Sequence, residues 1–258
     1  MKIGFSSLSL FMTPLKEILE IAKNDGFDIV EILCEGPYWP RYVLENDKEI
    51  GIENIGKIAK SKGIELFLHG PTVDLNPGSM NRGIREETAK QTIETLDYGK
   101  KIGAKAVTIH PGLVHRKEKR IRDTATEYAI DILKSCQEHG KKIGVELCIE
   151  NMPANIKFLG NTPQEHRMIV EEVGCSSTID WGHAITCENP YEYLNTPKIR
   201  YFHLNDNDGE KDQHLNLGEG VGDFSKELLN KIDYGIIELN QYENVLKGKE
   251  YIKKQLND

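Results

Sequence analysis

Long apolar runs, a leader-like start and paired cysteines are all missing from this sequence of 258 residues. No run reaches the ~18 apolar residues that a membrane helix needs. The first residues lead directly into strand-like sequence, without the basic stretch and apolar core of a signal peptide. The five cysteines are odd in number and form no CxxC pair, which favours reduced thiols. We therefore expect a cytoplasmic protein without a membrane segment.

An excess of basic charge is missing as well. The chain has 33 Lys and Arg against 41 Asp and Glu, which gives a formal net charge of −8. This balance argues against a broad basic surface for nucleic acid, although a local basic patch or bound metal ions would still attract phosphate. Hydrophobic residues at 38% and charged residues at 29% exclude whole-chain disorder.

Short apolar runs rich in β-branched residues alternate with longer stretches whose apolar residues recur every three or four positions. This alternation is typical of strands followed by helices. The strand-like runs cover residues 3–8, 28–33, 64–69, 104–110, 143–150, 176–180, 199–204 and 235–239. The helical stretches lie near residues 14–24, 52–62, 85–102, 122–142, 163–173, 190–195, 224–231 and 243–256.

Eight strand–helix pairs predict an α/β fold, a single (β/α)8 TIM barrel that forms one domain over residues 1–258. Parallel strands that are buried on both faces have near-continuous apolar sequences, as these do. A doubly wound open sheet is the competing architecture. It is less favoured because the sequence has no GxGxxG motif and more strand–helix pairs than such sheets usually contain.

The third to eighth strand-like runs each have a His, Asp or Glu at their last position or one residue before it. These residues are His69, His110, Glu150, Asp180, His203 and Glu238. In a TIM barrel the carboxyl ends of the strands form the active-site face. One such histidine is more often a satisfied core residue, but six ionisable groups at one rim indicate a metal site, because an unpaired buried charge is unfavourable. Imidazoles mixed with carboxylates favour zinc, manganese or cobalt over calcium or magnesium.

Further candidates lie in the predicted loops. His183 follows Asp180 by three residues, and the Asp212-x-His214 spacing lets both side chains of an extended segment point the same way and share a cation. The alternatives are a histidine bonded to a backbone carbonyl and a solvated polar loop. Four residues are candidates for substrate contact, through stacking on a sugar or base or through a phosphate or hydroxyl group: Trp39, Arg82, Asn151 and Asn205.

Together these motifs resemble the superfamily of xylose-isomerase-like barrels, which includes endonuclease IV (AP endonuclease family 2) and the sugar-phosphate isomerases and epimerases. The resemblance runs over residues 3–240, from His69-Gly70-Pro71 and His110-Pro111-Gly112 to Glu150-Asn151 and the later motifs. It implies up to three zinc ions. The implied ligand sets are His69, His110 and Glu150; Glu150, Asp180, His203 and Glu238; and His183, Asp212 and His214.

The resemblance implies two enzymatic readings, and no obligate protein partner is evident. The leading one is endonuclease IV-like phosphoester hydrolysis of damaged, abasic DNA, in which Glu150 bridges two metals and Glu238 orients the attacking water. The alternative is isomerisation or epimerisation of a small sugar or phosphorylated sugar with one divalent metal, manganese or cobalt, and Glu150 and Glu238 as an acid–base pair.

Two features favour the alternative reading. Residues 71–75 lack the aromatic side chain that wedges into DNA in the family endonucleases, and the segment 206–212 is acidic where those enzymes carry basic residues. A third reading is a barrel that binds a metal or a carbohydrate without turning it over. It is the least favoured, because a binding protein has no need of two opposed glutamates and a full set of metal ligands.

Overall fold

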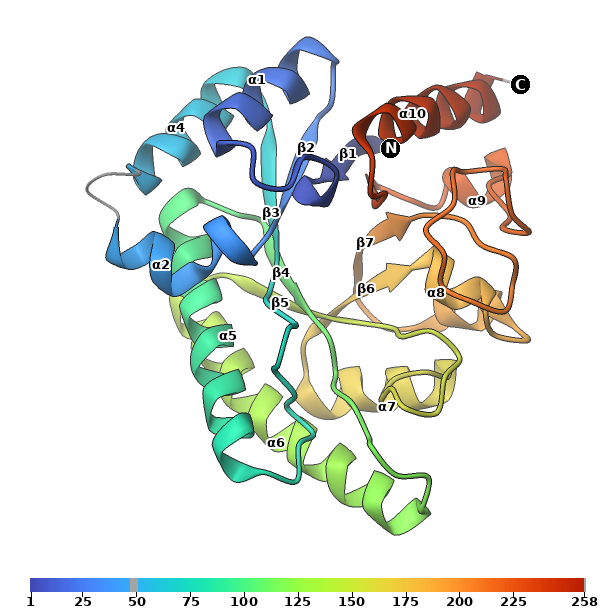
Figure 1. The fold of residues 1–258 in the computed structure, drawn as a ribbon. Helices are drawn as coiled ribbons and strands as arrows, with labels where there is room; N and C mark the ends of the chain where they lie inside the picture. The colour runs from blue at the N-terminus through green and yellow to red at the C-terminus, as the bar shows by residue number, and fades with distance from the viewer. Residues whose placement is uncertain (47–50, 258) are drawn as a thin grey trace.

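Parallel strands close into a barrel in the computed structural model, which describes residues 1–46 and 51–257. The strands follow one another around the barrel in chain order (Figure 1). The barrel closes where β8 pairs with β1. Their bounds are β1 Lys2–Ser6, β2 Ile29–Leu33, β3 Glu65–His69, β4 Ala106–Ile109, β5 Glu146–Glu150, β6 Ser176–Asp180, β7 Ile199–Leu204 and β8 Tyr234–Ile237. This topology confirms the predicted (β/α)8 TIM barrel.

Helices lie around the outside of the strands (Figure 1). The α-helices are α1 Leu15–Asn24, α2 Pro40–Glu45, α4 Ile52–Lys62, α5 Arg82–Ile102, α6 Lys119–Ile143, α7 Pro163–Val173, α8 Trp181–Ile185, α9 Lys226–Leu229 and α10 Tyr242–Asn257. Three 3-10 helices, η1 Ser7–Leu10, η2 Gly36–Tyr38 and η3 Pro190–Asn195, complete the elements of the described chain. None of the helices in this part of the chain is long and apolar enough to cross a bilayer.

The apolar spacing of the helices explains their packing on the barrel. In α1, Leu15, Ile18, Leu19 and Ala22 are buried, and their spacing of three or four residues places them on one face. That stripe packs into the large core cluster between the helices and the outer surface of the strands. Burial of this stripe accounts for the helical period that the sequence displays.

A separate small cluster fills the inside of the barrel. It consists of Ile29, Phe67, Ala106, Cys148, Tyr201 and Ile236. Phe67, Cys148 and Tyr201 each lie two residues before a strand-end His or Glu. Because side chains two residues apart in a strand share a face, the strand-end groups also point inward, above this apolar layer. The fold thereby directs ionisable groups from different strands toward one space.

The structure differs from the predicted elements in several places. The first predicted strand stops at Ser6, because residues 7–10 turn into η1. The helix predicted to end at 142 continues to Ile143 and stops at Gly144, whose φ of 73° few other residues adopt. The segments that contain α2 and α8 were predicted as loops, because each helix is too short to display a helical period.

Candidate metal centre

The first ligand group lies at the ends of β3, β4 and β5. His69 and His110 each direct Nε2 to Glu150 Oε2 at 3.2 Å. His69 and Glu150 are buried, whereas the side chain of His110 is 32% exposed and leaves one side of the group open. The ligand atoms of the three residues lie within 4.8 Å of one another, which is close enough for one cation to contact all three.

The second group joins Glu150 to the ends of β6, β7 and β8. His203 directs Nδ1 to Glu150 Oε1 at 2.8 Å and to Glu238 Oε2 at 3.2 Å, and Asp180 Oδ2 lies at 3.9 Å. The ligand atoms of these four residues again lie within 4.8 Å of one another. Glu150 uses one carboxylate oxygen toward each group, so it lies between the two groups as the resemblance implies.

The third group comes from α8 and from the loop after β7. His183 Nε2 lies 3.3 Å from Asp212 Oδ2, and His214 Nε2 lies 3.4 Å from Asp212 Oδ1. Asp206 organises this loop, because its buried carboxylate accepts backbone N–H groups of Asn207 and of three loop glycines, all at 2.9 Å. The predicted Asp212-x-His214 pair is thus held beside the barrel mouth by a side chain that the sequence alone did not single out.

Four of the histidines share one arrangement. One ring nitrogen donates to a fixed acceptor of the protein, which leaves the other nitrogen directed at the ligand group. The acceptors are the Gly70 carbonyl for His69, the Asn151 carbonyl for His183, the Glu238 carbonyl for His214 and the Glu31 carboxylate for His203. Such an outer bond fixes the tautomer and ring orientation of a metal-ligating histidine.

Glu31 is the residue that the sequence analysis missed. It lies in the middle of β2, is 0% exposed, and accepts hydrogen bonds from His203 Nε2 at 3.0 Å and from the Tyr201 hydroxyl at 2.7 Å. The signal was present, because Glu31 interrupts an apolar run in phase with Ile29, which faces the barrel interior. The sequence prediction considered only residues at strand ends, and Glu31 is the central residue of β2.

The electrostatics of the first two groups show a strongly coupled network. Burial opposes ionisation of Glu150, but His203 and the neighbouring imidazoles outweigh burial and hold the pKa of Glu150 well below its ordinary value. Burial lowers the pKa of His69, but the Glu150 carboxylate and other acidic groups raise it to about 9 overall. Burial and the adjacent carboxylates raise the pKa of Asp180 to about 6 against the effect of the imidazoles. Burial therefore pushes Asp180 toward its protonated form, whereas the imidazoles keep Glu150 ionised.

The four predicted substrate contacts occupy different places. Asn151 and Asn205 are fully buried, and both bond to Asp180: Asn151 to its backbone at 3.0 and 2.7 Å, Asn205 to its carboxylate at 3.2 and 3.0 Å. Arg82 has an 83% exposed side chain paired with Glu86. Trp39 donates Nε1 to Gln91 at 2.8 Å. The structure brings only the two asparagines to the ligand groups, where they support Asp180.

A cavity of about 220 Å³ opens over the three groups. It is lined by Glu150, Glu238 and four of the histidines, together with Asp212. The remaining histidines stay apart from it. His139 pairs with Asp97 at 2.7 Å, and His166 bonds to the Ile149 carbonyl inside the fold. A small polar substrate that enters this cavity would meet both glutamates and all three ligand groups.

Comparisons with known proteins agree with this architecture. A family profile described as a xylose isomerase-like TIM barrel matches residues 19–256. This chain is similar to an uncharacterized protein of Methanocaldococcus jannaschii, with 30% identity over 99% of this chain and 89% of the relative. It is also similar to a Mycobacterium leprae protein named probable endonuclease 4, with 24% identity over 78% of this chain and 79% of that protein.

Solved structures also resemble this chain. One described as a D-tagatose 3-epimerase-like protein has a TM-score of 0.87 and 28% identity, and the match covers 100% of this chain and 97% of that one. The resemblance that the sequence motifs predicted is therefore confirmed. The epimerase-like structure matches more of the chain, at higher identity, than the probable endonuclease does.

Proposed function

The chain belongs to the xylose isomerase-like TIM barrel family, and we propose that it is a divalent-metal-dependent isomerase or epimerase of a small sugar or sugar phosphate. The observation that carries the proposal is the group of Glu150, Asp180, His203 and Glu238, whose ligand atoms lie within 4.8 Å of one another. Glu150 and Glu238 also line the cavity of about 220 Å³. The site thus offers cation ligands and two carboxylates for proton transfer in one place.

The donor set fits a divalent cation. The second group gathers three carboxylates around one imidazole, and Asp180, His203 and Glu150 are at most 1% exposed. Unpaired buried carboxylates are strongly unfavourable, and a cation would neutralise them. The raised pKa of Asp180, caused first by burial, has the same origin. Nitrogen and oxygen ligands in this mixture suit zinc, manganese or cobalt.

Proton transfer is assigned to the two glutamates. A bound divalent cation would supply a Lewis acid that polarises a substrate carbonyl. Glu150 lines the cavity, and its carboxylate would accept a proton from the carbon beside that carbonyl. Glu238 also lines the cavity, and in its protonated form it would donate a proton to the substrate carbon from the other face, while Glu150 keeps the proton that it removed. His183 would hold a substrate hydroxyl at the same mouth.

The endonuclease reading has less support than this alternative. The rim next to the third group carries exposed acidic residues, Asp208 and Glu210, and such a rim repels a nucleic acid backbone. The similarity to the probable endonuclease covers less of the chain at lower identity than the similarity to the epimerase-like structure. Metal-assisted phosphoester hydrolysis is the second candidate. The observation that favours it is the complete third group of His183, Asp212 and His214.

Hydrogen exchange with solvent tests the proposal. The protein, loaded in turn with zinc, manganese and cobalt, is incubated in D2O with a panel of ketoses, aldoses and their phosphates. We expect metal-dependent loss of one substrate C–H signal in the proton NMR spectrum, followed by appearance of the isomer or epimer. Absence of exchange across the panel, together with release of inorganic phosphate or cleavage of an abasic oligonucleotide, would favour the second candidate instead.

Variants separate the two candidates. Glu150→Gln should abolish the exchange, because it removes the proton acceptor, and Glu238→Gln should abolish formation of the epimer, because it removes the group that returns the proton. Asp212→Asn changes only the third group, so the exchange should persist in that variant, whereas a hydrolase that needs three metals would lose its activity. Loss of exchange in all three variants, with equal loss of bound metal, would contradict the proposal that the second group performs the proton transfer without the third.

A further inference from the structure

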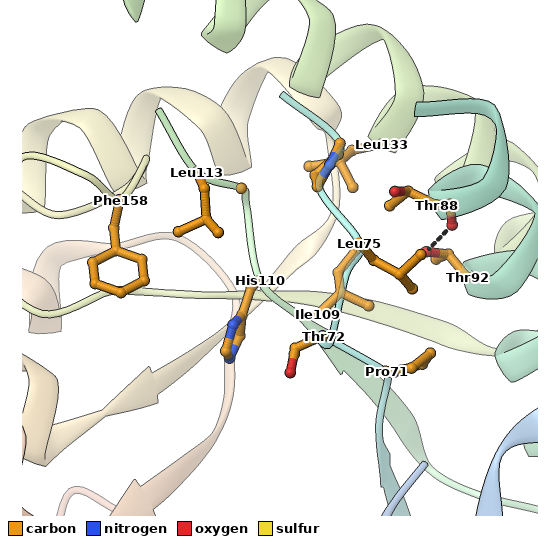
Figure 2. Close-up of a pocket in the computed structure, with 12 residues that line it drawn as sticks. Pro71, Thr72, Leu75, Thr88, Thr92, Ile109, His110, Leu113, Leu133 and Phe158 are labelled. Atoms are coloured by element: carbon orange, nitrogen blue, oxygen red, sulfur yellow. Dashed lines mark hydrogen bonds between the residues drawn. The ribbon is translucent and has the colours of Figure 1, made fainter. Parts of the chain in front are cut away.

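A second cavity, of about 270 Å³, lies beside the cavity of the ligand groups. We call it the side cavity. It is enclosed by the loop after β3, the helices α5 and α6, and the loop after β4. Its walls are mainly apolar and include Pro71, Leu75, Ile109, Leu113, Leu133 and Phe158. Figure 2 shows His110 and Phe158 on one side of this space and Thr88 on the other.

The side cavity adjoins the cavity of the ligand groups. Thr72, His110 and Phe158 line both. His110 contributes Nε2 to the first ligand group, and the other side of its ring faces the side cavity (Figure 2). A molecule whose one end contacts the ligand groups can therefore extend past His110 and place its other end among apolar side chains.

The two threonine hydroxyls that α5 contributes to the wall of the side cavity already have partners. The Thr88 hydroxyl donates to the Ile84 carbonyl at 2.7 Å and accepts the Asn76 N–H at 2.9 Å. The Thr92 hydroxyl donates to the Thr88 carbonyl at 2.8 Å, the bond drawn in Figure 2. Because these groups are engaged inside the protein, the wall presents little hydrogen-bonding capacity to an occupant. A sugar hydroxyl placed there would lose its water without a replacement partner.

The size of the side cavity matches an apolar group rather than one water molecule. An apolar cavity of ~150 Å³ in a protein stays dry and binds benzene. The side cavity, at about 270 Å³, exceeds that volume. It therefore has room for an aromatic ring or a branched alkyl group together with the atoms that link it to the ligand groups.

We propose that the side cavity is a specificity subsite for an apolar substituent of the substrate. This inference rests on the proposed function and narrows it: among sugars and their derivatives, the preferred substrate is one that carries an aromatic or branched alkyl group. The oxygen-bearing end binds at the ligand groups. The apolar end passes His110 and lies between Leu75, Leu113 and Leu133.

A matched pair of metal-chelating probes tests this arrangement. Acetohydroxamic acid and phenylacetohydroxamic acid carry the same chelating group and differ by one phenyl ring. Their affinities for the metal-loaded protein are measured by calorimetry. Burial of the ring in an apolar site predicts that phenylacetohydroxamic acid binds roughly tenfold or more tightly than acetohydroxamic acid.

Variants that fill the side cavity should erase this difference. Leu113→Trp and Leu75→Trp enlarge side chains on two separate loops. Leu113 makes its bonds to Asn76 through the backbone, so the larger side chain breaks none of them. In either variant the two probes should bind with similar affinity, and acetohydroxamic acid should bind as to the unaltered protein. Ile156→Trp is the matched control, because Ile156 is 48% exposed and does not line the side cavity.

The outcomes distinguish failure of the inference from failure of the proposed function. Equal affinity of both probes for the unaltered protein would overturn the subsite while leaving the metal site intact. A tenfold preference that survives in both Leu113→Trp and Leu75→Trp would also overturn it. If neither probe binds, cobalt titration of the same protein decides: cobalt binding without probe binding would overturn the subsite alone, and no cobalt binding would remove the metal site and the subsite with it.

Discussion

Glu31→Gln is the most direct test of how the second ligand group is held. The substitution keeps the shape of the side chain and one carbonyl oxygen, which still accepts from the Tyr201 hydroxyl. It removes the negative charge that faces His203 Nε2 at 3.0 Å in a fully buried environment. Hydrogen bonds to an ionised group are roughly twice as strong as neutral ones, so His203 loses part of what fixes its ring.

The expected effect is a loss of metal affinity. Removal of an outer partner of a metal-ligating residue typically costs 10- to 100-fold in affinity. A second effect opposes this loss. Burial lowers the pKa of His203, but Glu31, Glu238 and Glu150 raise it well above the ordinary value, so protons compete with the cation for the ring. Loss of the Glu31 charge weakens that competition. We therefore expect a decrease of about tenfold, or ~1.4 kcal/mol, in the affinity for cobalt or manganese.

Calorimetric titration of the metal-free protein with cobalt measures this affinity, and the visible spectrum of bound cobalt reports the ligand geometry. Glu146→Gln is the matched control, because Glu146 pairs with Arg200 at 2.9 Å at the opposite end of the barrel strands. This control should bind cobalt as the unaltered protein does. A Glu31→Gln protein with unchanged cobalt affinity and spectrum would refute the role assigned to Glu31.

Three other substitutions probe the supports of the site and of the fold. In Gly182→Ala, the new Cβ would lie 1.7 Å from Asn205 Oδ1, so Asn205 must release Asp180; we expect ~1–3 kcal/mol lower stability in urea unfolding and weaker metal binding. In Asp206→Asn, the amide cannot accept all four backbone N–H groups, and we expect the free energy of unfolding to fall by ~2–4 kcal/mol. The substitution should disturb the third group and leave the spectrum of cobalt bound at the second group unchanged. Burial lowers the pKa of His166 to about 4, below its unfolded value, so its contribution to stability is complete above pH ~6.5 and is lost as the pH falls toward 4. Between pH 7 and 5 this loss amounts to ~2 kcal/mol, and His166→Gln should remove that part of the pH dependence of urea unfolding.

The fold was predictable because its physical signals are local. Eight buried parallel strands produce continuous apolar runs, and helices such as α1 display one apolar stripe each. Errors fell where tertiary contacts decide short segments. The strand at residues 3–8 stops at Ser6, whose side chain accepts the Leu8 N–H and starts η1. A segment of four residues is too short to show a periodicity from which such a turn could be predicted.

The ligand groups were predictable to the extent that strand ends reveal them. His69, Glu150 and Asp180 end β3, β5 and β6, His203 lies one residue before the end of β7, and in a barrel all strand ends share one rim. The outer contacts were not predictable, because they depend on which side chains meet across the barrel. Glu31 and His203 are 172 residues apart in the chain. Asn205 was expected to contact substrate. Its side-chain amide instead donates to the Asp180 carboxylate at 3.0 Å, a contact that exists only in the folded chain.

The origin of each ligand suggests how the site divides its roles. The second group is built on strands β5, β6 and β7 and on the residue after β8, so backbone pairing between strands fixes the spacing of its ligands. Asp212 and His214 of the third group instead depend on a loop that Asp206 holds through backbone N–H groups. Groups built on regular elements are held more precisely than groups built on loops. In the proposed isomerase or epimerase, proton transfer between carbons tolerates little displacement of the reacting groups, which favours the second group as the centre of that chemistry over the third.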